Sequence, residues 1–290
     1  MALSLTGYQP MQQGLDFLDA MPAGGNAKVV QRVIDRWDDL YDRLEGDPAA
    51  QAAIAARVVR TYGPRLSQLG FVPKTGEPAV DAVLRPTLIA TLGKYRDPAV
   101  LAEASRLFAA WKQDPEAIPG SLKSTWLGVI ARNADAATWE ALHERARATS
   151  GTVERTSLYQ MLGRTQDEGL SRRALDLALT DEPGKTISSG MITAVAGQHP
   201  KLAIDFVLSH LSQVNQLIDI SGRSRFMQRL AGSSRDPALI AVLEAYASAN
   251  LADSDRKPIQ QAIDRIRSQS AETARIRAET EAWLKAHPQG

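Results

Sequence analysis

Apolar residues recur along this chain at the spacing of an α-helix. From residue 30 to residue 44 they fall on one helical face, as Val30, Val33, Ile34, Trp37, Tyr41 and Leu44. Gly46, Asp47 and Pro48 follow, and they predict a helix end and a new start, because Asp caps a helix and Pro is tolerated in its first turn. Alternating runs joined by short glycine turns are missing. The pattern therefore predicts an all-α fold.

Five dipeptides mark the starts of further predicted helices: Asp97-Pro98, Asp135-Ala136, Asp167-Glu168, His199-Pro200 and Asp236-Pro237. Successive markers are 38, 32, 32 and 37 residues apart. An apolar helix is expected before each marker, at about residues 80–94, 121–133, 153–164, 185–197 and 223–232. Two helices per repeat indicate a HEAT-like α-α superhelix, a curved solenoid of antiparallel helix pairs. The physical cause is that one pair cannot bury both of its apolar faces, so neighbouring pairs stack.

Three segments interrupt this periodic pattern. Gly70–Ala79 is rich in Pro and Gly and is expected to be a loop. Pro86 falls within a predicted helix, which should either kink or begin there. Residues 1–27 are expected to be a lead-in that contains a short helix and a hinge at Gly24-Gly25. Residues 1–30 are more apolar than the solvent-facing cap of a solenoid needs, which mildly favours an interface with a missing domain.

Composition excludes several classes of protein. The 34 Lys+Arg and 33 Asp+Glu residues leave a net charge of +1, which gives no long-range field for nucleic acid or an anionic membrane. The absence of cysteine excludes disulfides and thiolate metal sites. No apolar run is long enough to span a bilayer, and the first ten residues lack the pattern of a signal peptide. We expect a soluble protein, and the compartment stays open between cytoplasm and periplasm.

The sequence contains no self-contained active site. The nearest approach to a zinc motif is HERAR, from His143 to Arg147. Zinc needs a second imidazole four residues after the first, and a guanidinium at that position cannot bind a cation. His143 and Glu144 are therefore expected to be a solvated pair on a helix. No serine has a nucleophile-elbow sequence, and no glycine-rich loop has a phosphate-binding pattern. We predict no catalytic, cofactor-binding or metal-binding residue in this chain.

Several longer segments carry a family resemblance. They are LGF at 69–71, GEPAVDAVLRPTLIATLG at 76–93, AEASRLFAAW at 102–111, TAVAGQHPKLAIDFVLSHL at 193–211, GRSRFMQRLAG at 222–232 and RKPIQQAIDRIRSQ at 256–269. In this order they resemble the helical C-terminal domain of gluzincin zinc aminopeptidases, the family of aminopeptidase N and puromycin-sensitive aminopeptidase. The resemblance implies that residues 28–290 form this domain and that residues 1–27 lead in from a catalytic domain.

In that family, the resemblance implies, the helical domain is a bowl that closes over the catalytic domain and limits which peptides enter. Both the zinc motif HExxH and the GAMEN segment are absent from this chain. Zinc and the release of N-terminal amino acids would therefore belong to the parent protein. The expected partners are the catalytic domain of the same polypeptide and peptide substrates.

A basic cluster is the best candidate for substrate contact. Arg223, Arg225 and Arg229 lie close together, and Arg225 and Arg229 share a helix face. Guanidinium groups suit a peptide carboxylate or acidic side chains, so these residues are candidates to hold the far end of a peptide. The alternative is a solvated helix start that pairs with nearby carboxylates. For Arg85 we expect a buried salt bridge, with Glu103 as a candidate partner.

Three functions remain open at this point. The first is a non-catalytic lid domain of a zinc aminopeptidase. The second is a free-standing α-solenoid scaffold that binds protein partners on its concave face, with the same fold and repeats. The third is an enzyme that uses carboxylates in the groove, which no spacing of residues supports.

Overall fold

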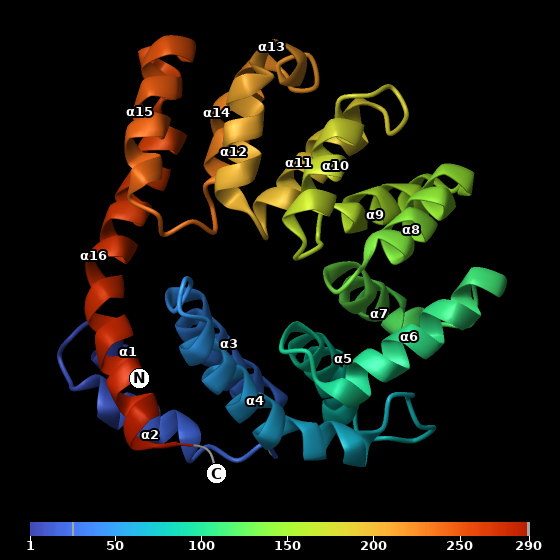
Figure 1. Cartoon of the computed structure of the whole chain (residues 1–290), viewed down its shortest axis with the longest axis vertical. Coiled ribbons are helices and arrows are strands. Elements are labelled where there is room, and N and C mark those ends of the chain that lie inside the picture. The colour runs from blue at the N-terminus through green and yellow to red at the C-terminus, as the bar shows by residue number, and fades with distance from the viewer. Residues whose placement is uncertain (25, 289–290) are drawn as a thin grey trace. The chain divides into compact units, whose positions relative to one another are not determined.

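The computed structural model describes residues 1–24 and 26–288, and in these residues the protein is helical throughout (Figure 1). Sixteen α-helices and two short 3₁₀ turns make up 75% of the described residues, and no strand occurs among them. The helices pack as consecutive pairs, which confirms the predicted all-α solenoid of helix pairs. The chain forms two compact units. Unit 1 is Met1–Val129 with Ala271–Gly290, and unit 2 is Ile130–Ser270.

Unit 1 combines the first helices of the chain with the end of the last one. Its helices are α1 (Ala2–Leu5), α2 (Met11–Asp19), α3 (Ala27–Arg43), α4 (Pro48–Leu69), α5 (Ala79–Lys94), α6 (Pro98–Gln113), most of α7 (Gly120–Arg132) and the second half of α16 (Lys257–Ala286). Four tryptophans are buried in it: Trp37, Trp111, Trp126 and Trp283. The short lead-in helix exists as α2. Gly25, half of the predicted hinge, lies outside the described residues.

The loop between α4 and α5 is as predicted, and Arg85 holds it in place. Residues 70–78 lie outside any helix. Arg85 is 1% exposed, donates to Glu77 at 2.8 Å and donates to the Gly70 carbonyl at 2.9 Å. The buried salt bridge is thus confirmed, but its expected partner is wrong, because Glu103 pairs with Arg106 at 2.7 Å. Pro86 lies inside α5, so the helix does not begin there.

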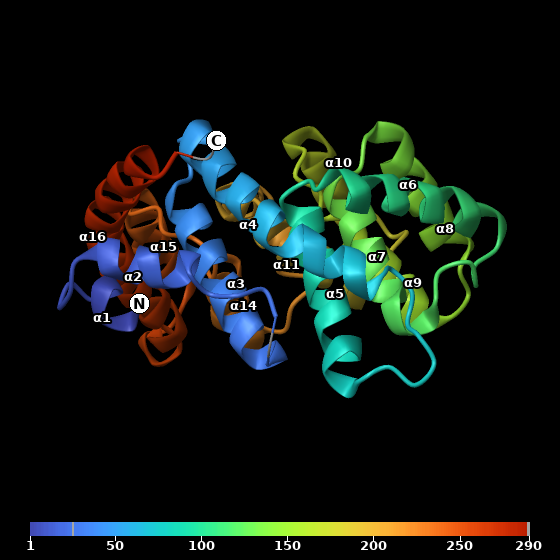
Figure 2. The same cartoon turned by 90° about the horizontal axis from the view of Figure 1, so that it is seen from below.

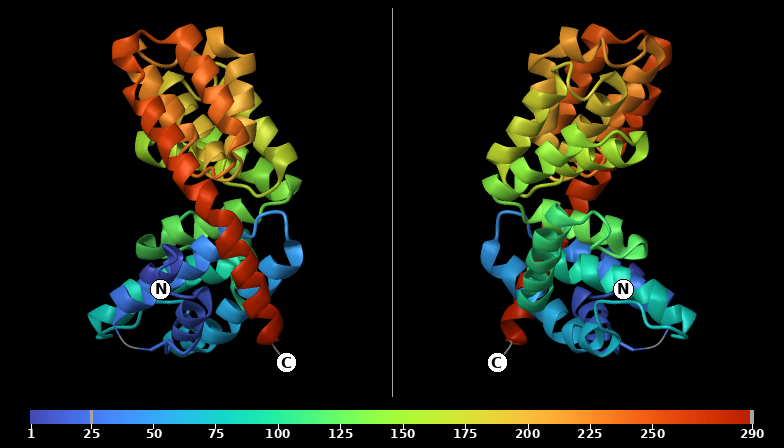
Figure 3. Two further views of the ribbon diagram at one scale, coloured as in Figure 1. Left: turned by 90° about the vertical axis from the view of Figure 1, so that its left-hand side faces the viewer. Right: turned by 90° about the vertical axis from the view of Figure 1, so that its right-hand side faces the viewer.

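Unit 2 contains the regular repeats. Its helices are α8 (Ala136–Ala148), α9 (Thr152–Leu162), α10 (Glu168–Ala178), α11 (Lys185–Ala196), α12 (Pro200–Ser209), α13 (Leu211–Val214), α14 (Arg223–Leu230), α15 (Ala238–Asn250), the first half of α16 and two 3₁₀ turns, Ile220–Gly222 and Asp253–Asp255. The yellow and orange helices run side by side in both views of Figure 3. Helix α11 packs against both α9 and α14, so these three helices are successive neighbours in one layer, and α11 also packs against α12.

The predicted helix starts are confirmed, and Asp side chains cap several of them. Helices α6, α8, α10 and α12 begin at the second residue of their marker dipeptides, and α15 begins one residue later. The carboxylates of Asp97, Asp135 and Asp167 each accept a backbone N–H bond from the first turn, at 2.7–2.9 Å. Each cap satisfies a donor that the helix itself leaves unpaired.

Candidate functional site

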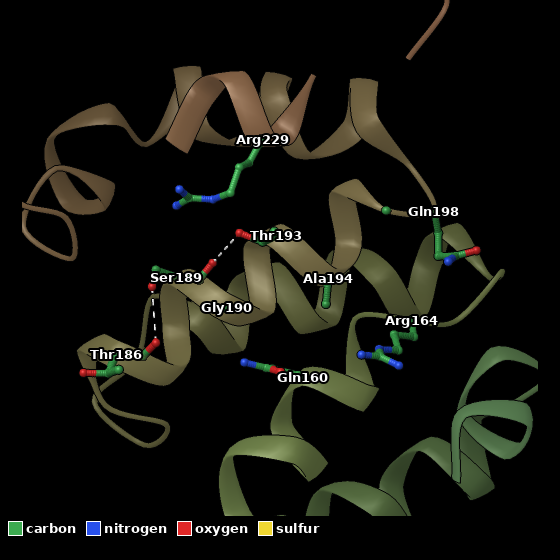
Figure 4. Close-up of a pocket in the computed structure, with 10 residues that line it drawn as sticks. Gln160, Arg164, Thr186, Ser189, Gly190, Thr193, Ala194, Gln198 and Arg229 are labelled. Carbon is green, nitrogen blue, oxygen red and sulfur yellow. Dashed lines mark hydrogen bonds between the residues drawn. The ribbon is translucent and has the colours of Figure 1, made fainter. Parts of the chain in front are cut away.

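An open groove of about 560 Å³ lies in unit 2, along the layer of α9, α11 and α14 (Figure 4). Its floor is the solvent-accessible face of α11, where small residues follow helical spacing: Thr186, Ser189, Gly190, Thr193, Ala194 and Gly197. The Ser189 and Thr193 hydroxyls donate to carbonyls of their own helix, at 3.2 and 2.9 Å. The groove has the size of an ordinary ligand site, and its shallow floor admits the main chain of a ligand.

Long polar side chains form the two walls of the groove. Gln160 and Arg164 lie on one side of α11, and Arg229 lies on the other (Figure 4). The amide of Gln160 reaches so far over the floor that a Cβ at Gly190 would lie 2.6 Å from its Nε2 atom. Gln198 closes one end and accepts a hydrogen bond from Arg132 at 2.5 Å. A side chain at Gly190 would displace Gln160 and narrow the groove.

The groove is cationic, although the chain as a whole is nearly neutral. Neither Arg164 nor Arg229 has an acidic partner within the described residues, and no carboxylate lines the groove. Helices α9, α11 and α14 together carry five basic residues and one acidic residue, Glu154. Helices α8, α10, α12 and α15 carry five basic and six acidic residues. Although the net charge of the whole chain is only +1, the layer of α9, α11 and α14 is positively charged. Such a layer attracts anionic groups.

The three arginines predicted for substrate contact lie in different places. Arg229 lines the groove, with its guanidinium 5.6 Å from the centre of the Phe226 ring. Arg225 is exposed one turn earlier on α14 and does not line the groove. Arg223 instead donates to the carbonyl of Asn215 at 3.1 Å. Sequence reasoning missed Arg164, which follows the end of α9, because no local pattern distinguishes it from other exposed arginines.

A second polar cluster surrounds His143, and it corrects one prediction. His143 is 8% exposed, so the expectation of a solvated pair is wrong for His143, while Glu144 is exposed. The His143 Nε2 atom lies 2.6 Å from Glu182, and Tyr159 donates to the same carboxylate oxygen at 2.8 Å. Burial alone would raise the pKa of Glu182, but these hydrogen bonds outweigh it and lower that pKa. Burial also raises the pKa of Tyr159.

Through Glu182, this cluster holds the α10–α11 loop against α8 and α9. Its side chains are not arranged as the ligands of a metal ion. Arg147, at the position where a zinc motif needs histidine, lies 3.5 Å from Glu182. Among residues 1–24 and 26–288, no group of three His, Cys, Asp or Glu side chains is arranged to hold a metal ion. Within the same residues, no helix is both long and apolar enough to cross a membrane.

Consecutive helix pairs with a cationic groove along one layer define an α-helical repeat domain. Residues 1–268 match the family model of the ERAP1-like C-terminal domain, and the chain therefore belongs to that family. This confirms the resemblance noted in the sequence.

Plant aminopeptidases are among the relatives of this chain. Aminopeptidase M1-A of Oryza sativa subsp. japonica is 20% identical over 284 residues, which cover 96% of this chain and 32% of that protein. Aminopeptidase M1-D of the same organism is 24% identical over 186 residues, or 62% of this chain and 21% of that protein. Aminopeptidase M1 of Arabidopsis thaliana is 29% identical over 120 residues, 40% of this chain and 14% of that protein. The chain thus spans at most about a third of the length of these relatives.

Proposed function

We propose that this chain is the non-catalytic C-terminal domain of a zinc-dependent aminopeptidase, where it closes over the active-site chamber and shapes peptide access. The observation that carries the proposal is the family match over residues 1–268. The alignment of nearly the whole chain with one third of an aminopeptidase supports it. The parent protein would release N-terminal amino acids from peptides, and its catalytic domain would hold the zinc and be the partner of this domain.

Closure of such a domain would affect the reaction in two ways, by limiting access to the active-site chamber and by ordering the bound peptide. A lid excludes water from the chamber and fixes the peptide, so that the reacting bond meets the catalytic groups in a productive geometry. Neither effect requires a catalytic residue on the lid, which agrees with the absence of HExxH and GAMEN from this sequence.

The groove of unit 2 supplies the peptide contact in this proposal. Arg229 and Arg164 would bind the far carboxylate of a peptide, or an acidic side chain near it, because guanidinium groups form two parallel hydrogen bonds with carboxylates. The small residues of α11, such as Gly190 and Ala194, would let the peptide main chain lie close to the floor. Of the three arginines predicted from sequence, Arg229 is the best placed, and Arg164 joins it.

The identity of the domain is tested by the size of the polypeptide that carries it. An immunoblot of source cells, with the band checked by peptide mass spectrometry, should show a protein much larger than 31.4 kDa. The 290-residue chain alone should release no amino acids from peptides and bind no stoichiometric zinc. Zinc-dependent aminopeptidase activity of the chain alone would contradict the proposal. A native band at 31.4 kDa would instead favour the free-standing scaffold.

The groove is tested by exchanging its arginines in the complete aminopeptidase. Arg164→Gln and Arg229→Gln should each raise the KM for a peptide with a free C-terminal carboxylate roughly tenfold, because each removes a charge-assisted hydrogen bond. The KM for the same peptide with an amidated C-terminus should stay unchanged. Arg172→Gln is the matched control, since Arg172 is also exposed but lies on α10 and pairs with Glu168. Equal effects on both peptides would contradict the assignment.

A further inference from the structure

The first nineteen residues of unit 1 bury one set of apolar residues and expose another. On the inner side Met11, Leu15 and Leu18 are buried, with at most 3% of each residue exposed. On the outer side three large apolar residues face solvent: Leu3 is 53% exposed, Tyr8 83% and Phe17 57%. We call Leu3, Tyr8 and Phe17 the amino-terminal patch. Three large apolar residues exposed within one short segment indicate a second contact surface.

The segment that carries this patch is held firmly by α16. The backbone N–H of Met11 donates to Glu279 at 2.9 Å, and this bond, followed by the contact with Arg275, lowers the pKa of Glu279. Arg275 also donates to the carbonyls of Ser4 and Leu5, at 3.1 and 2.6 Å.

A further contact with α16 fixes the segment near Asp16. The indole of Trp283 donates to Asp16 at 2.7 Å. Helices α1 and α2 lie beside the red carboxyl-terminal half of α16 in Figures 1 and 2. The exposed apolar side chains are therefore presented by a fixed backbone.

Local geometry ties two residues of the patch together, and the third lies one helical turn from the contact between α1 and α2. The N–H of Tyr8 donates to the Leu3 carbonyl at 2.9 Å, which holds the two residues next to each other. Phe17 follows Gly14 by one turn of α2, and α1 packs at Gly14 so closely that a Cβ there would lie 2.8 Å from Ser4 Oγ. Residues 1–15, which include Leu3 and Tyr8, contain no Asp, Glu, Lys or Arg, and the first charged side chains, Asp16 and Asp19, flank Phe17. Depletion of charge around exposed aromatic residues is typical of the core of a protein interface.

We propose that the amino-terminal patch is the surface on which the preceding domain of the parent protein docks, through a complementary apolar surface without buried charge. The inference rests on the proposed function. The matched family model describes a C-terminal domain, which other domains of a parent protein would precede, and the whole patch lies within the amino-terminal part of the match, at residues 3–17. About two thirds of the length of Aminopeptidase M1-A lie outside its match to this chain, which leaves ample polypeptide to cover the patch. The lead-in would thus form the interface with that domain, and its contacts with α16 would hold it in position.

Tyrosine footprinting of the full polypeptide tests this docking, because Tyr8 is the most exposed tyrosine of the six. Tyr62, Tyr95, Tyr159 and Tyr246 are buried, and Tyr41 is half-buried. We expect tetranitromethane to modify Tyr8 no faster than the half-buried Tyr41. The double variant Leu3→Ser/Phe17→Ser should raise the rate at Tyr8 roughly tenfold by loosening the contact. Val153→Ser, which removes an 85% exposed valine of α9, is the control and should leave that rate unchanged.

The outcomes separate the docking surface from the function of the domain. If the polypeptide is much larger than 31.4 kDa and Tyr8 reacts like a free tyrosine, the docking proposal is overturned and the proposed function stands. If the native polypeptide has a mass of 31.4 kDa, the proposed function fails and the docking proposal fails with it. Protection of Tyr8 in a dimer of that small chain would assign the patch to a second copy. Circular dichroism confirms that the variants remain folded.

Discussion

At the scale of single residues, Arg85 fixes the conformation of the loop between α4 and α5. Its guanidinium is buried and donates to Glu77 and to the carbonyls of Leu69 and Gly70, so it ties residues 70–78 to α5. Arg85→Met should lower the free energy of unfolding by about 2–3 kcal/mol, because it leaves these acceptors without their donor. Urea unfolding measures the effect. Arg106→Met removes an exposed arginine that pairs with Glu103, and it should change little.

The same pair predicts a dependence of stability on pH. The hydrogen bond from Arg85 lowers the pKa of Glu77 to about 2 from its ordinary 4.5. Because the folded protein has the lower pKa, the ionised carboxylate stabilises it fully above about pH 4.5, and this contribution disappears as the pH falls toward 2. The difference in unfolding midpoint between wild type and Glu77→Gln should shrink across this window. A difference that stays constant through it would contradict the role of Glu77.

At the scale of helices, aspartate caps define where the repeats begin. The carboxylate of Asp97 accepts the N–H of Val100 at 2.9 Å, one residue before Pro98 starts α6. Asp97→Ala should cost about 1 kcal/mol of stability, because the first turn loses its cap. Asp97→Asn keeps an oxygen acceptor and should cost clearly less. Thermal unfolding of both variants tests the cap, and equal losses would show that charge matters more than the hydrogen bond.

The helix starts were predictable because their signals are local. The apolar spacing and the Asp or Pro at each start lie within a few residues, and α6, α8, α10 and α12 begin where these signals place them. The partners of Arg85 and His143 were not predictable in this way. Glu77 and Glu182 lie in loops, and the path of a loop depends on the helices packed around it rather than on a periodic pattern.

The candidate groove was only partly predictable for a related reason. Arg229 lies in a basic cluster that is visible in the sequence, whereas Arg164 reaches the groove because α9 and α14 both flank α11. Which side chains face each other across a helix depends on how the repeats stack. A single sequence carries no direct signal of that arrangement.

At the scale of the whole molecule, unit 1 depends on residues from both ends of the chain. Ile276 and Trp283 of α16 are buried in it, and Arg57 donates to the carbonyl of His287 at 2.9 Å. A chain that stops after Ser270 should lose at least about 3 kcal/mol of local stability in unit 1, because large buried side chains are removed. Hydrogen exchange should then speed up in α2–α4 and stay nearly unchanged in α9–α12. Uniform loss of protection in both units would contradict this division.

Unit 1 is built from two separate stretches of the chain, and this determines when it can fold during synthesis. Unit 2 is one continuous stretch, Ile130–Ser270, so it can fold as soon as it leaves the ribosome. The first 129 residues must wait for Ala271 and the residues after it. At about 5–20 residues per second, the ribosome needs roughly 7–28 s to make the intervening stretch. During that time the apolar faces of α2, α3 and α4 lack their last neighbour and are open to chaperones, so these helices are the part of the domain most exposed to aggregation.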